Sequence, residues 1–381
     1  MKKNILKTTT VLFIIILFTS ISSLSTSTKN LISSQNLLTK LNLYQNSIDM
    51  LIFTSPQYAD DTEIQTAINL YSDAVKDDIG WDTKIIKIKQ ADNDYKKIDQ
   101  TIEKYHELYN IKACIMVGED INTALSGDCD YMEKPSTVPW FTIGGEDAYM
   151  LSEQGVVSKP YLMDICVSLI YPSHDFDYQT KKIQIISAFN KFCIRDNFFF
   201  DDVLVFESSA INMRSKEIYQ QIGNYGTLLY IEDPSDLKLS DSLDESYSMY
   251  YVHGHSNPSG TDLNIGDDGW FSANLVDELK TPFFGADGCY VGGWWSNQID
   301  NNKIDQSIDS LWYGSTIFTS KYIQVMVLGL LSQNGFSYPV CFIENAIPGL
   351  AEGKTLAESM ISHTYTGETV IVGNPTFHYS V

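Results

Sequence analysis

Residues 247–258 read YSMYYVHGHSNP, and residues 282–293 read PFFGADGCYVGG. Each stretch begins with a run of apolar and aromatic residues, which is typical of a strand buried in a sheet. The first run ends in two histidines separated by a glycine, and the second ends in Asp287-Gly288-Cys289. Parallel α/β sheets bind ligands beyond the carboxyl ends of their strands. If the two strands are neighbours, a histidine and a thiol face each other at one edge of the sheet.

A cysteine and a histidine in this arrangement can form a nucleophilic pair. The thiolate of Cys289 would attack a carbonyl carbon, and the imidazole of His253 or His255 would carry a proton to the leaving amine. Nearby glycines leave space for a substrate and leave amide N–H groups free to hold an oxyanion. Taken singly, the cysteine is more typical of a core or a disulfide, and the histidines of a solvated turn. A zinc site would need further ligands, and the nearby Asp262 and Asp267 have no recognisable spacing.

Most of the remaining chain alternates between strand and helix patterns. Apolar or alternating runs predict strands, and apolar residues at helical spacing predict helices. In the first part of the chain, strands are expected over residues 48–54, 84–88, 113–117 and 163–170, and helices over residues 60–78, 95–109 and 178–195. The alternation then starts afresh. Strands are expected over residues 203–206, 227–231, 247–252, 282–286, 313–319 and 369–372, and helices over residues 213–222 and 321–333.

This order of elements predicts an α/β protein of two packed halves with mainly parallel sheets, because strands separated by helices are joined by right-handed crossovers. The boundary is expected near residues 195–201, which contain no Gly/Ser linker. The halves should therefore pack tightly or share one sheet. We divide the chain into an N-terminal α/β subdomain over residues 47–198 and a second, catalytic α/β subdomain over residues 199–381.

The N-terminus is predicted to be a targeting segment. Lys2, Lys3 and Lys7 precede the apolar run VLFIIILF over residues 11–18, and a Ser/Thr-rich stretch follows. The run is shorter than the about 20 apolar residues of a membrane span. Residues 1–28 therefore fit a secretory signal peptide, with an uncleaved N-terminal anchor as the alternative. We expect the protein to be secreted or held at the cell surface, and to touch a membrane only through this segment.

The composition is that of a globular protein, and the charge is strongly acidic. The 381 residues include 44% apolar and 19% charged side chains, which excludes disordered and collagen-like chains. The 48 acidic and 26 basic residues give a net charge of −22, which repels phosphate backbones and argues against nucleic-acid binding. Six cysteines are too few for a disulfide scaffold, and none has the C-x-x-C spacing of a zinc or redox site.

Several segments, in the right order, resemble the caspase-like fold of cysteine peptidases and, within that clan, the gingipain-like peptidases. Residues 252–260, VHGHSNPSG, resemble the family's Gly-His-Gly-Ser-Pro turn. Residues 286–294, ADGCYVGGW, resemble its Ala-Cys-Tyr-x-Gly segment. Residues 368–379, ETVIVGNPTFHY, are similar to its closing Gly-Asp-Pro-Thr-Leu strand. Residues 48–60 and 110–120 (NIKACIMVGED) resemble its opening strand and its third strand, so the resemblance covers nearly all of the chain beyond the N-terminal segment.

This resemblance implies a cysteine endopeptidase with Cys289 as the nucleophile. The family's catalytic histidine precedes a glycine, which favours His253 followed by Gly254. Alignment of the turn on Gly-His-x-x-Pro selects His255 instead, with Ser256 in the place of the family's glycine. The second alignment needs no gap and is slightly preferred, and both histidines stay candidates.

The resemblance also implies further parts of the site. The oxyanion donors would be backbone N–H groups, with Gly254, Ser256 and Gly288 as the candidates. Asp287 matches an acidic position that lines the S1 pocket in clostripain-like relatives, where a carboxylate would favour cleavage after Arg or Lys. The alternative for Asp287 is a strand-end carboxylate bonded within the protein. Trp294 could form a wall of the substrate groove.

The sequence thus predicts a hydrolase, a cysteine-type peptidase that cleaves protein or peptide substrates through a Cys-His dyad. No metal or organic cofactor is required for this chemistry. Calcium, which gingipain-like domains often bind, could be held at residues 267–269, although an acidic turn is the simpler interpretation. The alternative function is a catalytically inactive gingipain-like domain that acts as an extracellular binding module. In that case Cys289 would be buried or disulfide-bonded, with the histidines pointing away from it.

Overall fold

The computed structural model describes residues 47–122, 124–127, 133–136, 140, 142, 161–172, 176–194, 198–211, 215–257, 260–263, 269–289, 317–331, 341–365 and 368–381. The predicted targeting segment at residues 1–28 lies outside these residues. Within them, no helix is long and apolar enough to cross a membrane.

Four parallel strands form the first half of the sheet. They are β1 (Met50–Thr54), β2 (Thr83–Lys87), β3 (Ala113–Val117) and β7 (Cys166–Ile170), in the order β2-β1-β3-β7. The helices described in this half are α3 (Thr62–Ile79), α4 (Tyr95–Tyr109) and α6 (Tyr178–Phe192). Since β2 and β3 lie on opposite sides of β1, right-handed crossovers place α3 and α4 on opposite faces of the sheet.

The second half repeats this arrangement. Its parallel strands are β8 (Asp202–Glu207), β9 (Thr227–Glu232), β10 (Met249–His253) and β14 (Phe283–Cys289), in the order β9-β8-β10-β14. The crossover helices are α7 (Ser215–Ile222) and α8 (Asp236–Leu243). The strand order in this half therefore mirrors that of the first half.

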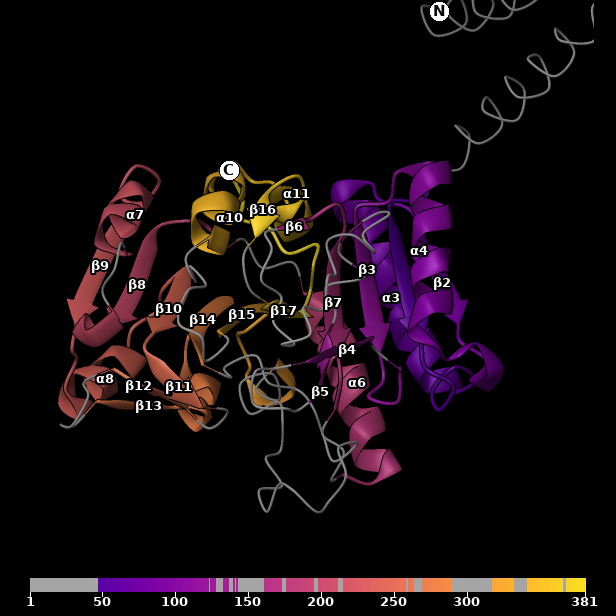
Figure 1. Ribbon diagram of the computed structural model, residues 1–381, viewed down its shortest axis with the longest axis horizontal. Helices are drawn as coiled ribbons and strands as arrows, with labels where there is room; N and C mark the ends of the chain where they lie inside the picture. Colours follow the sequence, from indigo (N-terminus) through magenta and orange to yellow (C-terminus); the bar gives the residue numbers. More distant parts are fainter. Residues whose placement is uncertain are drawn as a thin grey trace, which may run out of the picture. The chain divides into compact units, whose positions relative to one another are not determined.

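Two further strands join the halves into one ten-stranded sheet (Figure 1). β15 (Val325–Leu331) pairs parallel with β14, and β17 (Glu368–Gly373) pairs parallel with β7. β15 and β17 pair with each other in the antiparallel direction. The first-half strands and the second-half strands therefore run in opposite directions. Their carboxyl ends point to opposite sides.

Shorter elements complete the described structure. Three small sheets are formed by β11 (His255–Asn257), β12 (Gly260–Asp262) and β13 (Trp270–Ser272), by β4 (Ala124–Gly127) and β5 (Glu133–Ser136), and by β6 (Tyr161–Leu162) and β16 (Thr364–Tyr365). The remaining helices are α10 (Cys341–Ala351), α11 (Leu356–Met360) and the 3-10 turns η1 (Gln90–Asp92), η3 (Ser209–Ile211) and η4 (Ala273–Glu278).

Local sequence determines the ends of the first-half helices. Asp61, Asp94 and Asp177 precede α3, α4 and α6, and each side chain accepts hydrogen bonds from backbone N–H groups of the first turn. α3 and α4 end at Gly80 and Asn110, which adopt left-handed conformations with φ of 76° and 58°. Both ends of α3 and α4 therefore agree closely with the prediction from sequence.

One predicted helix is a strand. The sequence pattern predicts a helix over residues 321–333, but β15 occupies this segment. The run VMVLGLL is apolar throughout and lies between β14 and β17, and periodicity alone does not distinguish such a buried strand from a buried helix. The strand predicted over residues 313–319 is also wrong where it is described, because residues 317–319 are helical. Residues 313–316 lie outside the described part of the chain.

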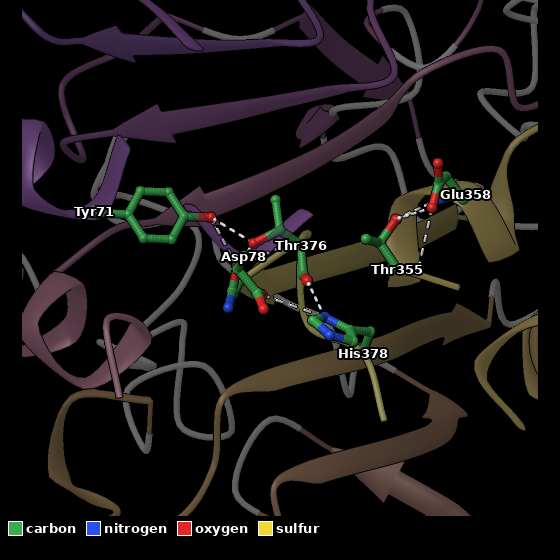
Figure 2. Close-up of polar contacts among 7 residues, drawn as sticks. Tyr71, Asp78, Thr355, Glu358, Thr376 and His378 are labelled. Atoms are coloured by element: carbon green, nitrogen blue, oxygen red, sulfur yellow. Dashed lines mark hydrogen bonds and ion pairs between the residues drawn. The ribbon is translucent and has the colours of Figure 1, made fainter. Parts of the chain in front are cut away.

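The turn after β17 makes polar contacts with α3. Tyr71 OH donates a hydrogen bond to Asn374 Oδ1 (2.7 Å) and lies 3.1 Å from Thr376 Oγ1 (Figure 2). Asn374 Oδ1 also accepts a bond from the backbone N–H of Thr376 (3.0 Å). His378 Nδ1 lies 3.7 Å from Asp78 Oδ2 at the far end of α3. The segment predicted to be a closing strand thus fixes β17 through polar contacts with a helix of the first half.

Candidate functional site

Three strand ends in the second half bring two carboxylates and an imidazole together. In the parallel ladder, His253 of β10 is in register with Glu207 of β8 on one side and with Asp287 of β14 on the other. Residues in register share a face of a parallel sheet, so these three side chains lie on the same face. Each is at most 2% exposed. The strands before His253 and Cys289 are neighbours, which is the condition under which the sequence places a histidine and a thiol at the same end of the sheet.

Glu207 holds the ring of His253 in place. Its Oε1 lies 3.0 Å from Nδ1 of His253, and its Oε2 accepts a hydrogen bond from Tyr230 OH on β9. A carboxylate beside Nδ1 favours the tautomer that carries its proton there and leaves Nε2 as an acceptor. Nε2 is buried and has no hydrogen-bond partner among the described residues. An imidazole with one nitrogen held by a carboxylate and the other free can act as a general base.

Asp287 is bonded inside the protein. Tyr251 OH, from β10, donates a hydrogen bond to its Oδ2. Burial raises the pKa of Asp287 from 3.8 to about 7, although the bond from Tyr251 and the charge of His253 act in the opposite direction. Tyr219 of α7 packs on Tyr251 with ring centroids 5.9 Å apart, so this helix covers the face that carries the carboxyl group. Asp287 therefore has the contacts of a strand-end carboxylate bonded within the protein.

The raised pKa of Asp287 predicts that stability falls as the pH rises from about 4 to about 7. In this window the folded protein retains a proton on Asp287 that the unfolded chain has already lost, because an unfolded aspartate titrates near pH 3.9. The loss amounts to roughly 4 kcal/mol at most, and the contribution is constant above pH 7. We expect Asp287→Asn to lack this decline in urea unfolding measured across the same pH range.

The comparison between variants isolates this one group. The other titrating groups are common to wild type and Asp287→Asn, so the difference between the two stability curves reports Asp287 together with its coupling to the charge of His253. Glu232→Gln, an exposed substitution in β9, should give a curve parallel to that of wild type. Parallel curves for wild type and Asp287→Asn would show that the buried carboxyl group ionises without cost.

His255 lies beyond the end of β10, in a small sheet that covers the opposite face of the main sheet. Phe271 of β13 stacks on Phe284 of β14 with ring centroids 6.1 Å apart. A Cβ on Gly288 would lie 2.0 Å from Ser256 Oγ, so Ser256 points toward β14. Successive side chains of a strand point to opposite sides. His255 therefore points away from β14, which agrees with its exposure to solvent.

Close packing accounts for the glycines at positions 254 and 288. A Cβ on Gly254 would lie 2.5 Å from the carbonyl oxygen of Asp262, and a Cβ on Gly288 would come still closer, 2.0 Å, to Ser256 Oγ. The N–H of Gly254 donates to the carbonyl oxygen of Asp287 (3.3 Å), and Ser256 Oγ donates to that of Gly254 (3.1 Å). The oxyanion role of Gly254, Ser256 and Gly288 stays a prediction, beside a packing role that the structure explains.

Cys289 is the last residue of β14, two positions beyond Asp287. Its backbone is paired with Leu331 of β15, and its side chain lies outside the described part of the structure. Trp294 and residues 264–268, which include most of the suggested calcium turn, also lie outside it. In the part that is described, no three His, Cys, Asp or Glu side chains are grouped to hold a metal ion.

Two other cysteines have an environment that suppresses reactivity. Cys114 of β3 and Cys166 of β7 are completely buried, and burial raises the pKa of both thiols. A thiol that stays protonated is a poor nucleophile. Both residues therefore have the core role that their apolar strands predict.

Sequence reasoning missed Glu207, Tyr230 and Tyr251. Glu207 directly follows the strand predicted over residues 203–206, and a lone carboxylate at a strand end in the same half as the histidines was an available signal. Recognising it required the order of the strands, which places β8 next to β10. The two tyrosines lie within apolar strand patterns, where an aromatic residue is usually a core residue, and the sequence holds no signal of their hydroxyl contacts.

The comparisons with known proteins agree at the level of the fold. No protein-family model matches the sequence, and no curated protein does. Among solved structures, the chain is similar to the Arg-specific cysteine proteinase gingipain R (RgpB), with a TM-score of 0.54 and 13% identity over 87% of this chain and 78% of that chain. It is also similar to the complex of the RgpB pro- and mature domains of Porphyromonas gingivalis, with a TM-score of 0.54 and 14% identity over 86% of this chain and 78% of that chain. The predicted fold is therefore confirmed: the chain has the mixed, mainly parallel α/β fold of the gingipain and caspase-like peptidases.

Proposed function

We propose that the protein is a cysteine peptidase in which Cys289 is the nucleophile and His253 is the acid–base residue. One observation carries the proposal: the buried pair of Glu207 and His253 leaves Nε2 of the imidazole without a partner among the described residues, on the strand next to the one that ends in Cys289. The likeness in fold to gingipain R, a cysteine proteinase, supports the same interpretation.

The contacts favour His253 over His255 as the acid–base residue. His253 is buried beside a carboxylate, shares its face with Asp287, and lies in the ladder with β14. Cys289 is two positions beyond Asp287 in the same strand. His255 is exposed and belongs to the small sheet on the other face. We therefore assign the role to His253, against the slight preference that the turn alignment gave to His255.

The proposed reaction has two steps. His253 Nε2 accepts the proton of the Cys289 thiol, the sulfur bonds to the scissile carbonyl carbon, and the amine leaves with the proton that the imidazole returns. Water, deprotonated by the same imidazole, then cleaves the thioester, releases the acid and restores the thiol. Glu207 stabilises the imidazolium that forms in each step. Backbone N–H groups near Gly254 and Gly288 would hold the oxyanion, and this role requires the N–H of Gly254 to release the carbonyl oxygen of Asp287.

The substrates would be proteins or peptides, and cleavage after Arg or Lys is the first specificity to test. Asp287 precedes the proposed nucleophile by two residues and could pair with a basic side chain. Its carboxyl group now accepts a bond from Tyr251, so this role requires it to turn from the tyrosine toward the substrate. Secretion or display at the cell surface remains the prediction from residues 1–28.

Labelling with acyloxymethyl ketones that carry Arg, Lys or Leu at P1 tests the proposal on the full chain. We expect one covalent adduct, located by mass spectrometry at Cys289, and none in Cys289→Ala. Cys193→Ala is the control, because it removes a partly exposed cysteine at the C-terminal end of α6. This variant should be labelled at the same rate as wild type. The relative labelling rates of the three ketones report the P1 preference.

A folded wild-type protein that reacts with none of the ketones, after limited proteolysis and after addition of calcium, would contradict the proposal. The function would then be that of the second candidate, a gingipain-like domain that binds partners without catalysis. Labelling of Cys193 in place of Cys289 would likewise remove the assigned nucleophile.

A further inference from the structure

A basic pocket lies at the outer edge of the first half, on the other half of the sheet from His253. β2 and α4 line it, and its volume is about 410 Å³. Figure 1 shows these two elements side by side at the end of the sheet formed by the first half. Pockets of small-molecule ligands range over roughly 300–1,000 Å³, so this pocket has room for a small ligand.

Four lysines surround this pocket in a chain whose net charge is −22. Lys87 and Lys97 are paired with Asp60 and Asp92, at 3.1 Å in each case. Lys89 and Lys104 also line the pocket and are exposed, and neither ammonium group has an ion pair or hydrogen bond with any described residue.

The positions of the lysines follow from the secondary structure. Lys97, Thr101 and Lys104 are spaced four and three residues apart, so they form one stripe along α4. Lys87 is the last residue of β2 and Lys89 lies two residues beyond it; both line the pocket where the strand ends, alternating along the chain with Ile86 and Ile88. The stripe and the strand end face the same pocket, and two of its charges remain uncompensated.

The floor of the pocket is apolar. Phe53, Ile88 and Ile98 contribute to it, and each is at most 5% exposed. Ile86, which is in register with Phe53, adds a fourth apolar side chain on the same face. A ligand that only carried negative charge would leave this floor unused, and a purely apolar ligand would leave the two ammonium groups without a counterion.

We propose that this pocket binds a small carboxylate with an aliphatic body, whose carboxylate pairs with Lys89 and Lys104 and whose chain lies on Phe53, Ile88 and Ile98. The charge of the pocket, opposite to that of the chain as a whole, selects an anion, and the apolar floor selects its tail. This binding is independent of the proposed peptidase activity, since the pocket shares no residue with the site around His253.

Decanoate is the probe, titrated at low ionic strength into the full chain labelled at the isoleucine δ1 methyl groups. We expect shifts in the methyl resonances of Ile86, Ile88 and Ile98, whereas Ile185, buried on α6, should not respond. The double substitution Lys89→Ala/Lys104→Ala should weaken binding by about tenfold. It removes no hydrogen bond or ion pair with a described residue, and both side chains are exposed, so the fold should be retained.

The control is Lys84→Ala/Lys96→Ala. Lys84 lies on β2, just before the segment that carries Lys89, and Lys96 lies on α4 with Lys104; both lie outside the residues that line the pocket, and their loss changes the net charge equally. Equal weakening by the two double substitutions would overturn the proposal in favour of a general charge effect. If decanol bound as tightly as decanoate, the carboxylate would have no role, and if inorganic phosphate or hexaglutamate did so, the aliphatic chain would have none. Either result, or the absence of shifts at the three isoleucines, would also overturn the proposal.

Discussion

Substitution of His253 by alanine is expected to lower the rate of Cys289 labelling, and of peptide hydrolysis, by about 10²–10⁴-fold, which is the usual contribution of a general acid–base residue. His255→Ala should change either rate by less than about tenfold. The reason lies in the contacts: the ring of His253 is fixed by Glu207 next to β14, whereas His255 is exposed on the small sheet of the opposite face. The measurement is the second-order rate constant of labelling by the most reactive acyloxymethyl ketone.

The two variants serve as matched controls because both remove an imidazole from the same turn. His253→Ala also leaves Glu207 buried without its partner, so His253→Gln, which keeps a polar group near the carboxylate, should be measured with it. Thermal unfolding of all three proteins separates loss of fold from loss of reactivity. Retained labelling in folded His253→Gln, together with its loss in His255→Ala, would transfer the acid–base role to His255.

Glu207→Gln should lower kcat by about 10²–10³-fold and leave KM nearly unchanged. Glutamine has the shape of glutamate and can still bond to Nδ1 of His253 and to Tyr230, but it lacks the charge that stabilises the imidazolium during the reaction. Glu207 does not reach the substrate in this proposal, so binding of the substrate should be preserved. The measurement is steady-state hydrolysis of a peptide chosen by the P1 preference.

Tyr230→Phe and Glu232→Gln complete this test. Tyr230→Phe removes only the hydroxyl that bonds to the second oxygen of Glu207, so a loss of about tenfold or less is expected. Glu232 is in register with Glu207 on β9 but is exposed, and its substitution should leave kcat unchanged. Equal kcat in wild type and Glu207→Gln would show that the carboxylate has only a structural role.

The sequence contains enough to predict the sheet and the strands that carry the candidate site. Strands such as Met249–His253 are continuous apolar runs that end in Gly, Pro or polar residues, and these runs are short enough to be strands. The helix predicted over residues 95–109 agrees with α4 to the residue, and Asp94 and Asn110 show that the ends of this helix are defined locally. These are signals that neighbouring residues along the chain supply.

The rest depends on contacts between distant parts of the chain. The residues of β15 predict a helix, because an apolar run alone does not show that the segment pairs between β14 and β17. The contact of Glu207 with His253 joins residues 46 positions apart and follows only from the strand order. The same holds for the choice between the two histidines, since the bend at Gly254 that takes His255 to the other face depends on its packing against Asp262.

The position of β17 has a consequence for the order of folding. β17 lies in the middle of the sheet, between β7 and β15, yet it follows every other strand of that sheet in the sequence. During synthesis, the edges of β7 and β15 stay unpaired until this strand has left the ribosome. Both carry apolar residues and free backbone N–H and C=O groups, which makes them templates for pairing with other chains. Until β17 pairs with both, the nascent protein therefore exposes two half-sheets whose open strand edges can pair with other chains.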